Sequence, residues 1–299
     1  MIFENILGNE KNKELLKRIL TTNTISHSYM FIGEESTGKM LFAKEFAKGI
    51  LCENKDNRPC NNCISCVKFD NLNHPDLIVI DEKEETIKND QIREMNRNIL
   101  EKPIESNKKV YIINNSENMT QQAQNSLLKT LEEPPEHAVI ILITKDDNRM
   151  LNTIKSRCTK INFIPLTNLE LKEVLSKNFG IENTTRRMLE LANGSVKRAV
   201  ELNSNDELYS KLENIFANLN NIDLIDFLKH KEQIAENKEQ INTILDFINV
   251  ILFEKYNQNS KYLSCISIVE ETKERLEKNS NFDMTIDRLL MKIWEEING

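Results

Sequence analysis

Residues 33–40 have the spacing of a phosphate-binding loop, yet the last position does not suit nucleotide chemistry. They read Gly33-Glu34-Glu35-Ser36-Thr37-Gly38-Lys39-Met40, which fits G-x4-G-K. The next position of such loops is Ser or Thr, whose hydroxyl ligates the Mg²⁺ on the nucleotide phosphates. A thioether cannot replace it, because Mg²⁺ prefers hard oxygen ligands. We therefore expect a nucleotide-binding scaffold with an impaired centre, in which Gly33, Gly38 and Lys39 are the residues that could still contact a phosphate.

Four of the six cysteines lie within fifteen positions, as Cys52-x7-Cys60-x2-Cys63-x2-Cys66. In a cytosolic chain such clustering favours a metal over disulfides. Structural Zn²⁺ takes four soft ligands in a tetrahedron, and C-x2-C pairs place two sulfurs on one ion. We expect a zinc knuckle with a structural ion; an iron–sulfur cluster and four free thiols are the alternatives. The two remaining cysteines, Cys158 and Cys265, are not expected to be ligands.

The apolar pattern around these motifs predicts a parallel α/β sheet with helices on both faces. Helices are expected over 9–25, before the first strand, and between the strands over 40–51, 90–100 and 120–132. A strand directly before the glycine loop and a helix after it form the context that a P-loop requires. The expected strands are Tyr29–Ile32, Leu77–Ile80, Lys109–Ile113, Ala138–Ile143 and the weaker Lys160–Phe163.

After Pro165 the chain reads as helical throughout. Short helices are expected over 167–178, 184–192 and 195–202, the first with a capping box between Thr167 and Glu170. Residues 203–206 have the composition of a linker, and longer helices follow over 223–235, 239–256, 262–278 and 285–297. We therefore expect three domains: an α/β domain over 1–165 with a zinc insertion at 52–66, a three-helix lid over 166–204, and a helical domain over 205–299.

Composition places the chain among soluble globular proteins, with 39% hydrophobic and 29% charged residues in 299. No apolar run is long enough to span a bilayer, and the first residues lack a signal-peptide core. A cytoplasmic protein without a membrane partner is expected. The net charge of −7 argues against DNA binding by this chain's surface alone, so a nucleic-acid role would be shared with partners.

Several longer strings carry a family resemblance. They are Ser26–Tyr29, the four-cysteine insertion, His74-Pro75-Asp76, Asn125–Pro135 (NSLLKTLEEPP) and Ser156-Arg157-Cys158. Together they resemble the clamp-loader subunits of bacterial DNA polymerase III, over residues 1 to about 200. The resemblance implies an AAA+-type sheet domain, a small helical lid and an all-α collar domain in a pentameric ring. It also implies four partners: the motor (tau/gamma) subunits, the delta subunit, the sliding clamp and primed DNA.

Two kinds of subunit in that family must be distinguished: a motor that hydrolyses ATP, and a delta-prime subunit with degenerate ATP motifs. The strand over 109–113 should be followed by an Asp for Mg²⁺ and a Glu for the attacking water, but Asn114 and Asn115 stand there. An amide is no general base and brings no charge to a metal. We therefore expect a delta-prime-type scaffold that neither keeps ATP as a cofactor nor hydrolyses it. The alternatives are a motor subunit with an atypical P-loop and a zinc-stabilised protein unrelated to replication.

The resemblance gives Arg157 the most specific role. In the family, the arginine of this motif reaches the γ-phosphate bound by a neighbouring motor subunit and stabilises phosphoryl transfer in trans; a surface salt bridge is the alternative. Thr144 matches a phosphate-sensing position and Arg198 a lid arginine, although with an impaired pocket each could be an ordinary surface or strand-end residue. His74 is expected to serve turn geometry and not catalysis.

Overall fold

The structure is a computed structural model that describes residues 2–81, 86–256, 260–278 and 280–299. It divides into two compact units, and each is described by itself. The first comprises Met1–Val174 with Gly194–Val196, and the second comprises Leu175–Asn193 with Lys197–Gly299. The finer division into three domains remains a prediction.

The first unit is built on a five-stranded sheet of order β2-β3-β4-β1-β5, in which all neighbouring strands are parallel. The predicted strands are present, with ends shifted by at most one residue. Phe163 lies just beyond β5, although it was expected inside that strand. The strands are β1 Ser28–Ile32, β2 Leu77–Ile80, β3 Lys109–Ile113, β4 Ala138–Thr144 and β5 Thr159–Asn162.

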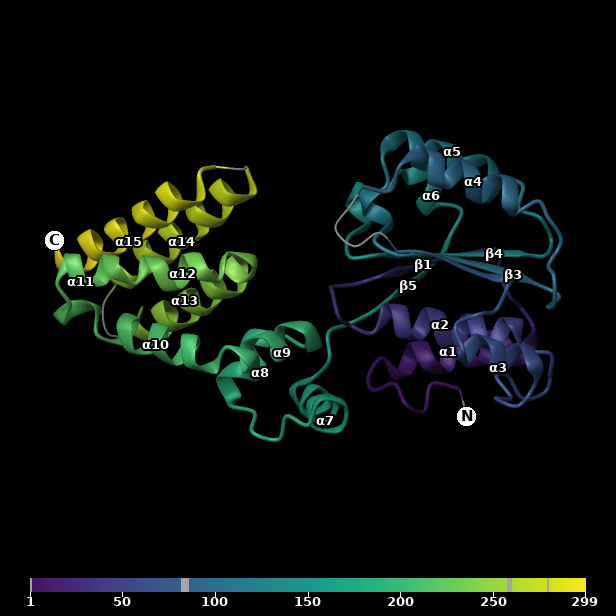
Figure 1. The fold of residues 1–299 in the computed structure, drawn as a ribbon, viewed down its shortest axis with the longest axis horizontal. Helices are drawn as coiled ribbons and strands as arrows, with labels where there is room; N and C mark the ends of the chain where they lie inside the picture. The colour runs from purple at the N-terminus through teal and green to yellow at the C-terminus, as the bar shows by residue number, and fades with distance from the viewer. Residues whose placement is uncertain (1, 82–85, 257–259, 279) are drawn as a thin grey trace. The chain divides into compact units, whose positions relative to one another are not determined.

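Helices cover both faces of this sheet, as the buried apolar strands predicted. Figure 1 shows α1, α2 and α3 on one face and α4, α5 and α6 on the other. Two 3₁₀ turns, η1 Ser116–Asn118 and η2 Asp147–Arg149, follow strands β3 and β4. The helices are α1 Glu10–Thr22, α2 Lys39–Leu51, α3 Ile64–Asp70, α4 Asn89–Asn98, α5 Gln121–Glu132 and α6 Asn152–Lys155.

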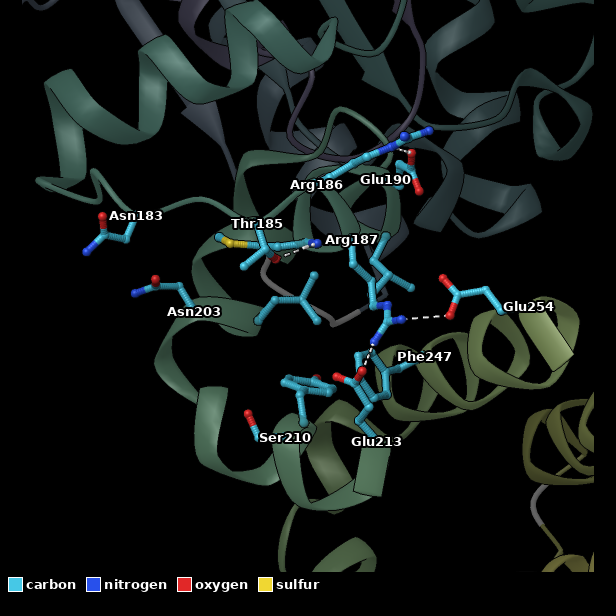
Figure 2. A pocket seen from close by; sticks show the side chains of 14 residues that line it. Asn183, Thr185, Arg186, Arg187, Glu190, Asn203, Ser210, Glu213, Phe247 and Glu254 are labelled. Atoms are coloured by element: carbon cyan, nitrogen blue, oxygen red, sulfur yellow. Dashed lines mark hydrogen bonds and ion pairs between the residues drawn. The ribbon is translucent and has the colours of Figure 1, made fainter. Parts of the chain in front are cut away.

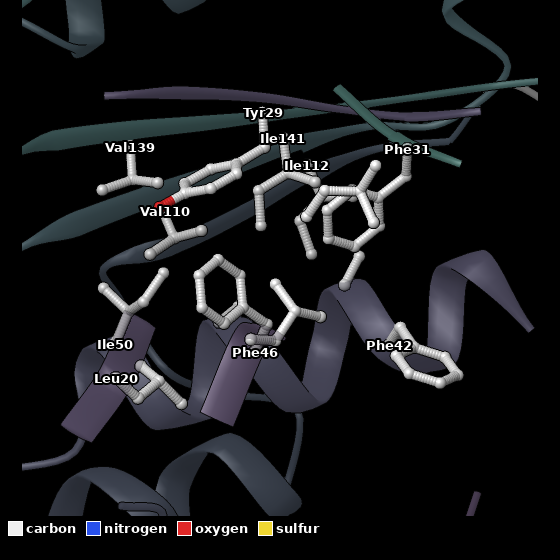
Figure 3. Packing of buried hydrophobic residues seen from close by; sticks show 14 of the residues in the cluster. Leu20, Tyr29, Phe31, Phe42, Phe46, Ile50, Val110, Ile112, Val139 and Ile141 are labelled. Atoms are coloured by element: carbon white, nitrogen blue, oxygen red, sulfur yellow. The ribbon is translucent and has the colours of Figure 1, made fainter. Parts of the chain in front are cut away.

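An aromatic cluster fills the space between the sheet and helix α2 (Figure 3). The ring of Tyr29 meets that of Phe46 at 5.1 Å, and the ring of Phe163 lies 5.2 Å from Phe31 and 5.0 Å from Phe42. Each fully buried aromatic side chain of this size contributes about 1.5–3 kcal/mol. Phe163 therefore belongs to the core, and its main chain lies directly under the glycine loop.

All regular elements that the structure describes after Pro165 are helices, and the second unit is built from them. Helix α7 begins in the first unit, which extends to Val174, and ends in the second. Helix α7 begins with the predicted capping box: Thr167 N donates to Glu170 Oε2 (2.8 Å), and Glu170 N donates to Thr167 Oγ1 (3.3 Å). Helices α13, α14 and α15 pack on one another in chain order. The elements are α7 Asn168–Phe179, α8 Arg186–Ala192, α9 Val196–Ser204, α10 Asp206–Ala217, η3 Leu219–Asn221, α11 Leu224–Lys229, α12 Lys231–Glu236, η4 Lys238–Gln240, α13 Ile241–Tyr256, α14 Lys261–Glu277 and α15 Phe282–Asn298.

The linker expected over 203–206 is wrong. Helix α9 continues through Ser204, and α10 begins at Asp206, so only Asn205 interrupts the helical path. Its side-chain amide donates to the Glu201 carbonyl (3.2 Å) and to Gln240 Oε1 (2.8 Å). The Asn205 side chain thus has partners in α9 and in the turn η4, and the chain passes from α9 to α10 without a loop. The helix expected over 223–235 is likewise two helices, divided at His230.

Across the part of the chain that the structure describes, no helix combines the length and the apolar character that a bilayer crossing requires.

Candidate functional site

The glycine loop lies between β1 and α2, as the sequence predicted. Gly33 N donates to the Thr144 carbonyl (3.2 Å). A Cβ at Gly33 would lie 2.5 Å from the Phe163 carbonyl oxygen, so the close approach of two main chains excludes any larger residue. Gly38, at φ 86°, is the N-cap of α2, in a conformation that favours glycine.

The ammonium of Lys39 is bonded to the loop itself. Its Nζ donates to the carbonyls of Gly33 (2.5 Å) and Glu34 (2.6 Å), and the residue is 8% exposed. Burial lowers the pKa of Lys39, while the negative charges of Glu117, Glu35 and Glu34 act in the opposite direction. These bonds occupy two of the three ammonium donors, and a phosphate at the third would also approach the carboxylates of Glu34 and Glu35, whose charges act on Lys39.

The positions after β3 carry amides where an active centre has acids. Asn114 Nδ2 donates to Asp81 Oδ1 (2.7 Å), and Asn115 is the left-handed N-cap of η1. The first carboxylate after the strand is Glu117, which is 7% exposed. Its Oε1 accepts from Lys145 N (3.4 Å), whereas Oε2 finds no partner among the described residues. Sequence reasoning did not single out Glu117, whose charge acts on Lys39.

Two further residues from the family resemblance have partners of their own. The buried hydroxyl of Thr144 donates to the Asp146 carbonyl (2.8 Å). Arg198 Nη2 pairs with Asp246 Oδ2 (2.8 Å) in the second unit, and Lys273 holds the other oxygen of that carboxylate (2.8 Å). Their sensing roles therefore stay predictions.

Arg157 lies in the short segment between α6 and β5, which is the edge strand of the sheet. Its carbonyl accepts from Ser28 Oγ (2.6 Å). Its guanidinium reaches Glu132 Oε1 through Nη2 (2.7 Å) and the Thr153 carbonyl through Nη1 (2.8 Å). The side chain is 33% exposed, so part of the cation faces solvent at the edge of the sheet.

Cys158, the next residue, does not belong to the group of cysteines whose sulfurs lie together. Burial raises the pKa of its thiol to about 11.

The other four cysteines of the first unit come together. The sulfurs of Cys52, Cys60, Cys63 and Cys66 all lie within 4.8 Å of one another. Neighbouring sulfurs on tetrahedral Zn²⁺ would be about 3.8 Å apart, given a Zn–S bond of about 2.3 Å, and Cys52 and Cys63 lie at 4.0 Å. The four-thiol donor set and this spacing fit a closed structural zinc site.

Main-chain amides point at these sulfurs, which favours the thiolate form that a metal needs. Cys60 N donates to Cys52 Sγ (3.4 Å), Cys63 N to Cys60 Sγ (3.3 Å) and Cys66 N to Cys63 Sγ (3.4 Å). The amide of Asn62 lowers the pKa of Cys60 to about 6, whereas burial raises the pKa of Cys52 and Cys66.

His74 supports the start of the cysteine segment. Its Nδ1 accepts from Asp76 N (3.1 Å), which leaves the proton of the neutral ring on Nε2, 2.9 Å from Ser65 Oγ. Ser65 in turn donates to the Leu51 carbonyl (2.7 Å), directly before the first cysteine. The contacts of His74 are structural, in line with the expected turn role.

The carboxylate of Asp76 is fully buried and accepts three main-chain amides. They belong to Ile104 (2.6 Å), Glu105 (2.8 Å) and Ser106 (2.8 Å). The His-Pro-Asp string thus joins the segment after α4 to the start of β2.

Comparison with known proteins decides the family. A family model described as "DNA polymerase III, delta subunit" matches residues 8–167, more than half of the chain. The chain belongs to this family. The resemblance of its sequence strings to clamp-loader subunits of DNA polymerase III is thereby confirmed.

Relatives of this chain include two kinds of subunit. DNA polymerase III subunit delta' of Bacillus subtilis is 36% identical over 194 residues, which cover 65% of this chain and 59% of the relative. Subunit gamma/tau of Mycoplasma pneumoniae is 35% identical over 207 residues, 67% of this chain and 30% of the relative. The chain thus spans less than two thirds of either relative.

A solved structure supports the fold of this clamp-loader protein. The gamma subunit-related protein of Thermotoga maritima superimposes with a TM-score of 0.51 at 21% identity, over 95% of this chain and 99% of that one. With the parallel sheet, its helices and the helical C-terminal region, this confirms the predicted AAA+-type fold class.

The second unit holds a cavity of about 890 Å³ that none of the predicted site residues lines (Figure 2). Arg187 reaches into it and pairs with Glu213 and with Glu254 (2.6 Å), and Arg186 pairs with Glu190 (2.7 Å). Two arginines thus face three glutamates, and every one of these side chains has a partner of opposite charge. The remaining lining residues are Asn183, Thr185, Met188, Leu191, Leu202, Asn203, Tyr209, Ser210 and Phe247.

Proposed function

We propose that this chain is a delta-prime-type subunit of a bacterial, cytoplasmic DNA polymerase III clamp loader. It serves as a scaffold in a pentameric ring with motor (tau/gamma) and delta subunits, which places the sliding clamp on primed DNA. It does not hydrolyse ATP itself, and it supplies Arg157 to the ATP site of a neighbouring motor subunit.

The observation that carries the first half of the proposal is the position of Lys39. Two of the three donors of its ammonium are bonded to the carbonyls of Gly33 and Glu34. Met40 cannot ligate Mg²⁺, and Asn114 and Asn115 replace the acids that would hold the metal and polarise water. The contacts of Lys39, the thioether of Met40 and the two amides together support a centre that does not hydrolyse ATP.

The position of Arg157 supports the proposed role at a neighbouring ATP site. It lies beside the edge strand β5, and its side chain is partly exposed. A guanidinium there could reach across an interface, where it would neutralise charge on a transferring phosphoryl group; such arginines accelerate phosphoryl transfer by about 10³–10⁵.

A structural Zn²⁺ held by Cys52, Cys60, Cys63 and Cys66 is part of the proposal. When bound, the ion would close the cysteine segment between α2 and α3. Its four-thiol donor set leaves no open position for chemistry.

The test replaces Arg157 with Ala in the reconstituted complex, with Arg97→Ala as a matched control at an exposed site on α4. Clamp- and DNA-stimulated ATP hydrolysis should fall by at least about tenfold in Arg157→Ala, with assembly intact, and stay unchanged in Arg97→Ala. Full ATPase activity in Arg157→Ala would refute the trans role.

An ATP-hydrolysing motor subunit with an atypical P-loop is the second candidate, favoured by the match to gamma/tau relatives. Binding and turnover of radiolabelled ATP by the isolated chain separate the two. Turnover that Lys39→Ala abolishes would establish the motor. Turnover at the level of a blank supports the scaffold.

A further inference from the structure

The guanidinium of Arg157 is fixed at both terminal nitrogens. Nη2 donates to Glu132 Oε1 (2.7 Å), and Nη1 donates to the Thr153 carbonyl (2.8 Å) and more weakly to Ser156 Oγ (3.4 Å). A guanidinium has five N–H donors, so two remain after these three contacts. The side chain is thus oriented and still has donors for a phosphate oxygen.

The carboxylate that fixes it stands on a rigid support. Glu132 is the last residue of α5, and Pro134-Pro135 prevents the helix from continuing. The last turn of α5 also contacts α4, because Thr130 Oγ1 donates to Asn96 Oδ1 (2.8 Å). Leu131 in the same turn is buried in the core. Glu132 therefore presents its charge from a well-defined place.

The pair is half exposed, with Glu132 at 49% and Arg157 at 33%. Ion pairs in such positions contribute little to folding stability. Their effect is on conformation, because a free arginine samples many rotamers and a fixed one does not. Orientation gained before the substrate binds lowers the entropic part of a reaction barrier.

We propose that Glu132 is a positioning residue that pre-orients Arg157 for the neighbouring ATP site. The inference rests on the proposed trans role of Arg157 and deepens it. Glu132 touches no substrate; it holds the guanidinium in one arrangement that leaves two N–H donors for a phosphate oxygen.

The test measures steady-state ATP hydrolysis by the reconstituted complex, with clamp and primed DNA, for Glu132→Gln, Arg157→Ala and the double variant. Glu133→Gln is the matched control, because it removes the same charge one position along an exposed turn. We expect Glu132→Gln to lower kcat about three- to tenfold with KM for ATP unchanged, and Glu132→Asp to restore part of the loss. In the Arg157→Ala background, Glu132→Gln should cause no further loss.

Four outcomes would overturn the inference. If Arg157→Ala abolishes stimulation and Glu132→Gln keeps it in full, the positioning role fails and the proposed function stands. If Arg157→Ala itself has no effect, both fail together. Equal losses in Glu132→Gln and Glu133→Gln, or a fall in the melting temperature that matches the loss of activity, would assign the effect to general charge or folding.

Discussion

The hydroxyl of Ser28 donates a 2.6 Å hydrogen bond to the main-chain carbonyl of Arg157, 129 residues further along the chain. Ser28 begins β1 and is 6% exposed. Two separate family strings, Ser26–Tyr29 and Ser156-Arg157-Cys158, therefore meet at one bond. Ser28 places the Arg157 main chain against the sheet, while Glu132 orients its side chain.

Removing this hydroxyl should affect both stability and the trans activity. Ser28→Ala leaves the Arg157 carbonyl without its buried donor, at a cost of about 1–2 kcal/mol in the free energy of unfolding. Denaturant unfolding of the isolated chain measures that cost. ATP hydrolysis by the reconstituted complex should fall as well. Ser26→Ala, at the long 3.3 Å contact with Thr159, is the control expected to change neither.

Zinc should be present in stoichiometric amounts and hold the cysteine segment. Metal analysis of unchelated protein is expected to give one Zn²⁺ per chain, and Cys60→Ser should lose most of it because one of four ligands is gone. Removal of the metal by a chelator should lower the melting temperature, since binding energy is folding energy at such sites. Cys265→Ser, which changes a buried thiol in the second unit, should retain the metal. Metal-free wild-type protein would contradict the site.

Asp76→Asn should be among the more damaging single substitutions in the first unit. The carboxylate accepts three amides in a fully buried place, and an Asn side chain must turn an N–H₂ group toward at least one of these donors. We expect a loss of about 2–4 kcal/mol in the free energy of unfolding. Asp90→Asn, on the exposed first turn of α4, should change stability by less than about 0.5 kcal/mol. Similar small losses at both positions would show that the three amide contacts are unimportant.

The sheet could be predicted because fully buried parallel strands are continuous apolar runs, which few other elements share. The error at Phe163 is one residue, because its ring belongs to the core and its amide still donates to the Ile32 carbonyl of β1 (2.7 Å) just past the end of β5. The linker over 203–206 was wrong because Asn and Ser favour loops in general. Here Asn205 bonds to Glu201 and Gln240, a partner 35 residues away. The composition of the segment cannot predict a contact with a residue so far along the chain.

The candidate residues themselves were readable from spacing, since a metal knuckle and a glycine loop impose fixed intervals. The contacts that these residues make in the structure could not be predicted from spacing. Lys39 turning onto its own loop is a choice of rotamer, and the pair of Arg157 with Glu132 joins residues 25 positions apart. The second contact depends on the tertiary structure, which brings the end of α5 next to the segment before β5.

The ring of His74 should stay neutral to lower pH than an ordinary histidine. Burial lowers its pKa, and Nδ1 accepts a hydrogen bond that protonation would remove. The unfolded chain, with a pKa near 6.5, takes up a proton first as the pH falls. The contribution of neutral His74 to the free energy of unfolding is therefore fully present above about pH 6.5. It is lost as the pH falls from there through the lower pKa of the folded state.

Proton NMR titration of the ring, assigned by its absence in His74→Gln, measures the folded pKa directly. Thermal unfolding between pH 7 and pH 5 should show a steeper loss of stability for the wild type than for His74→Gln, because only the wild type must protonate this buried ring. A midpoint at or above 6.5, or equal slopes for the two proteins, would mean that His74 is accessible to protons. In that case the hydrogen bonds from His74 through Ser65 to the Leu51 carbonyl would not depend on a neutral imidazole, and His74 would not support the cysteine segment in the way described above.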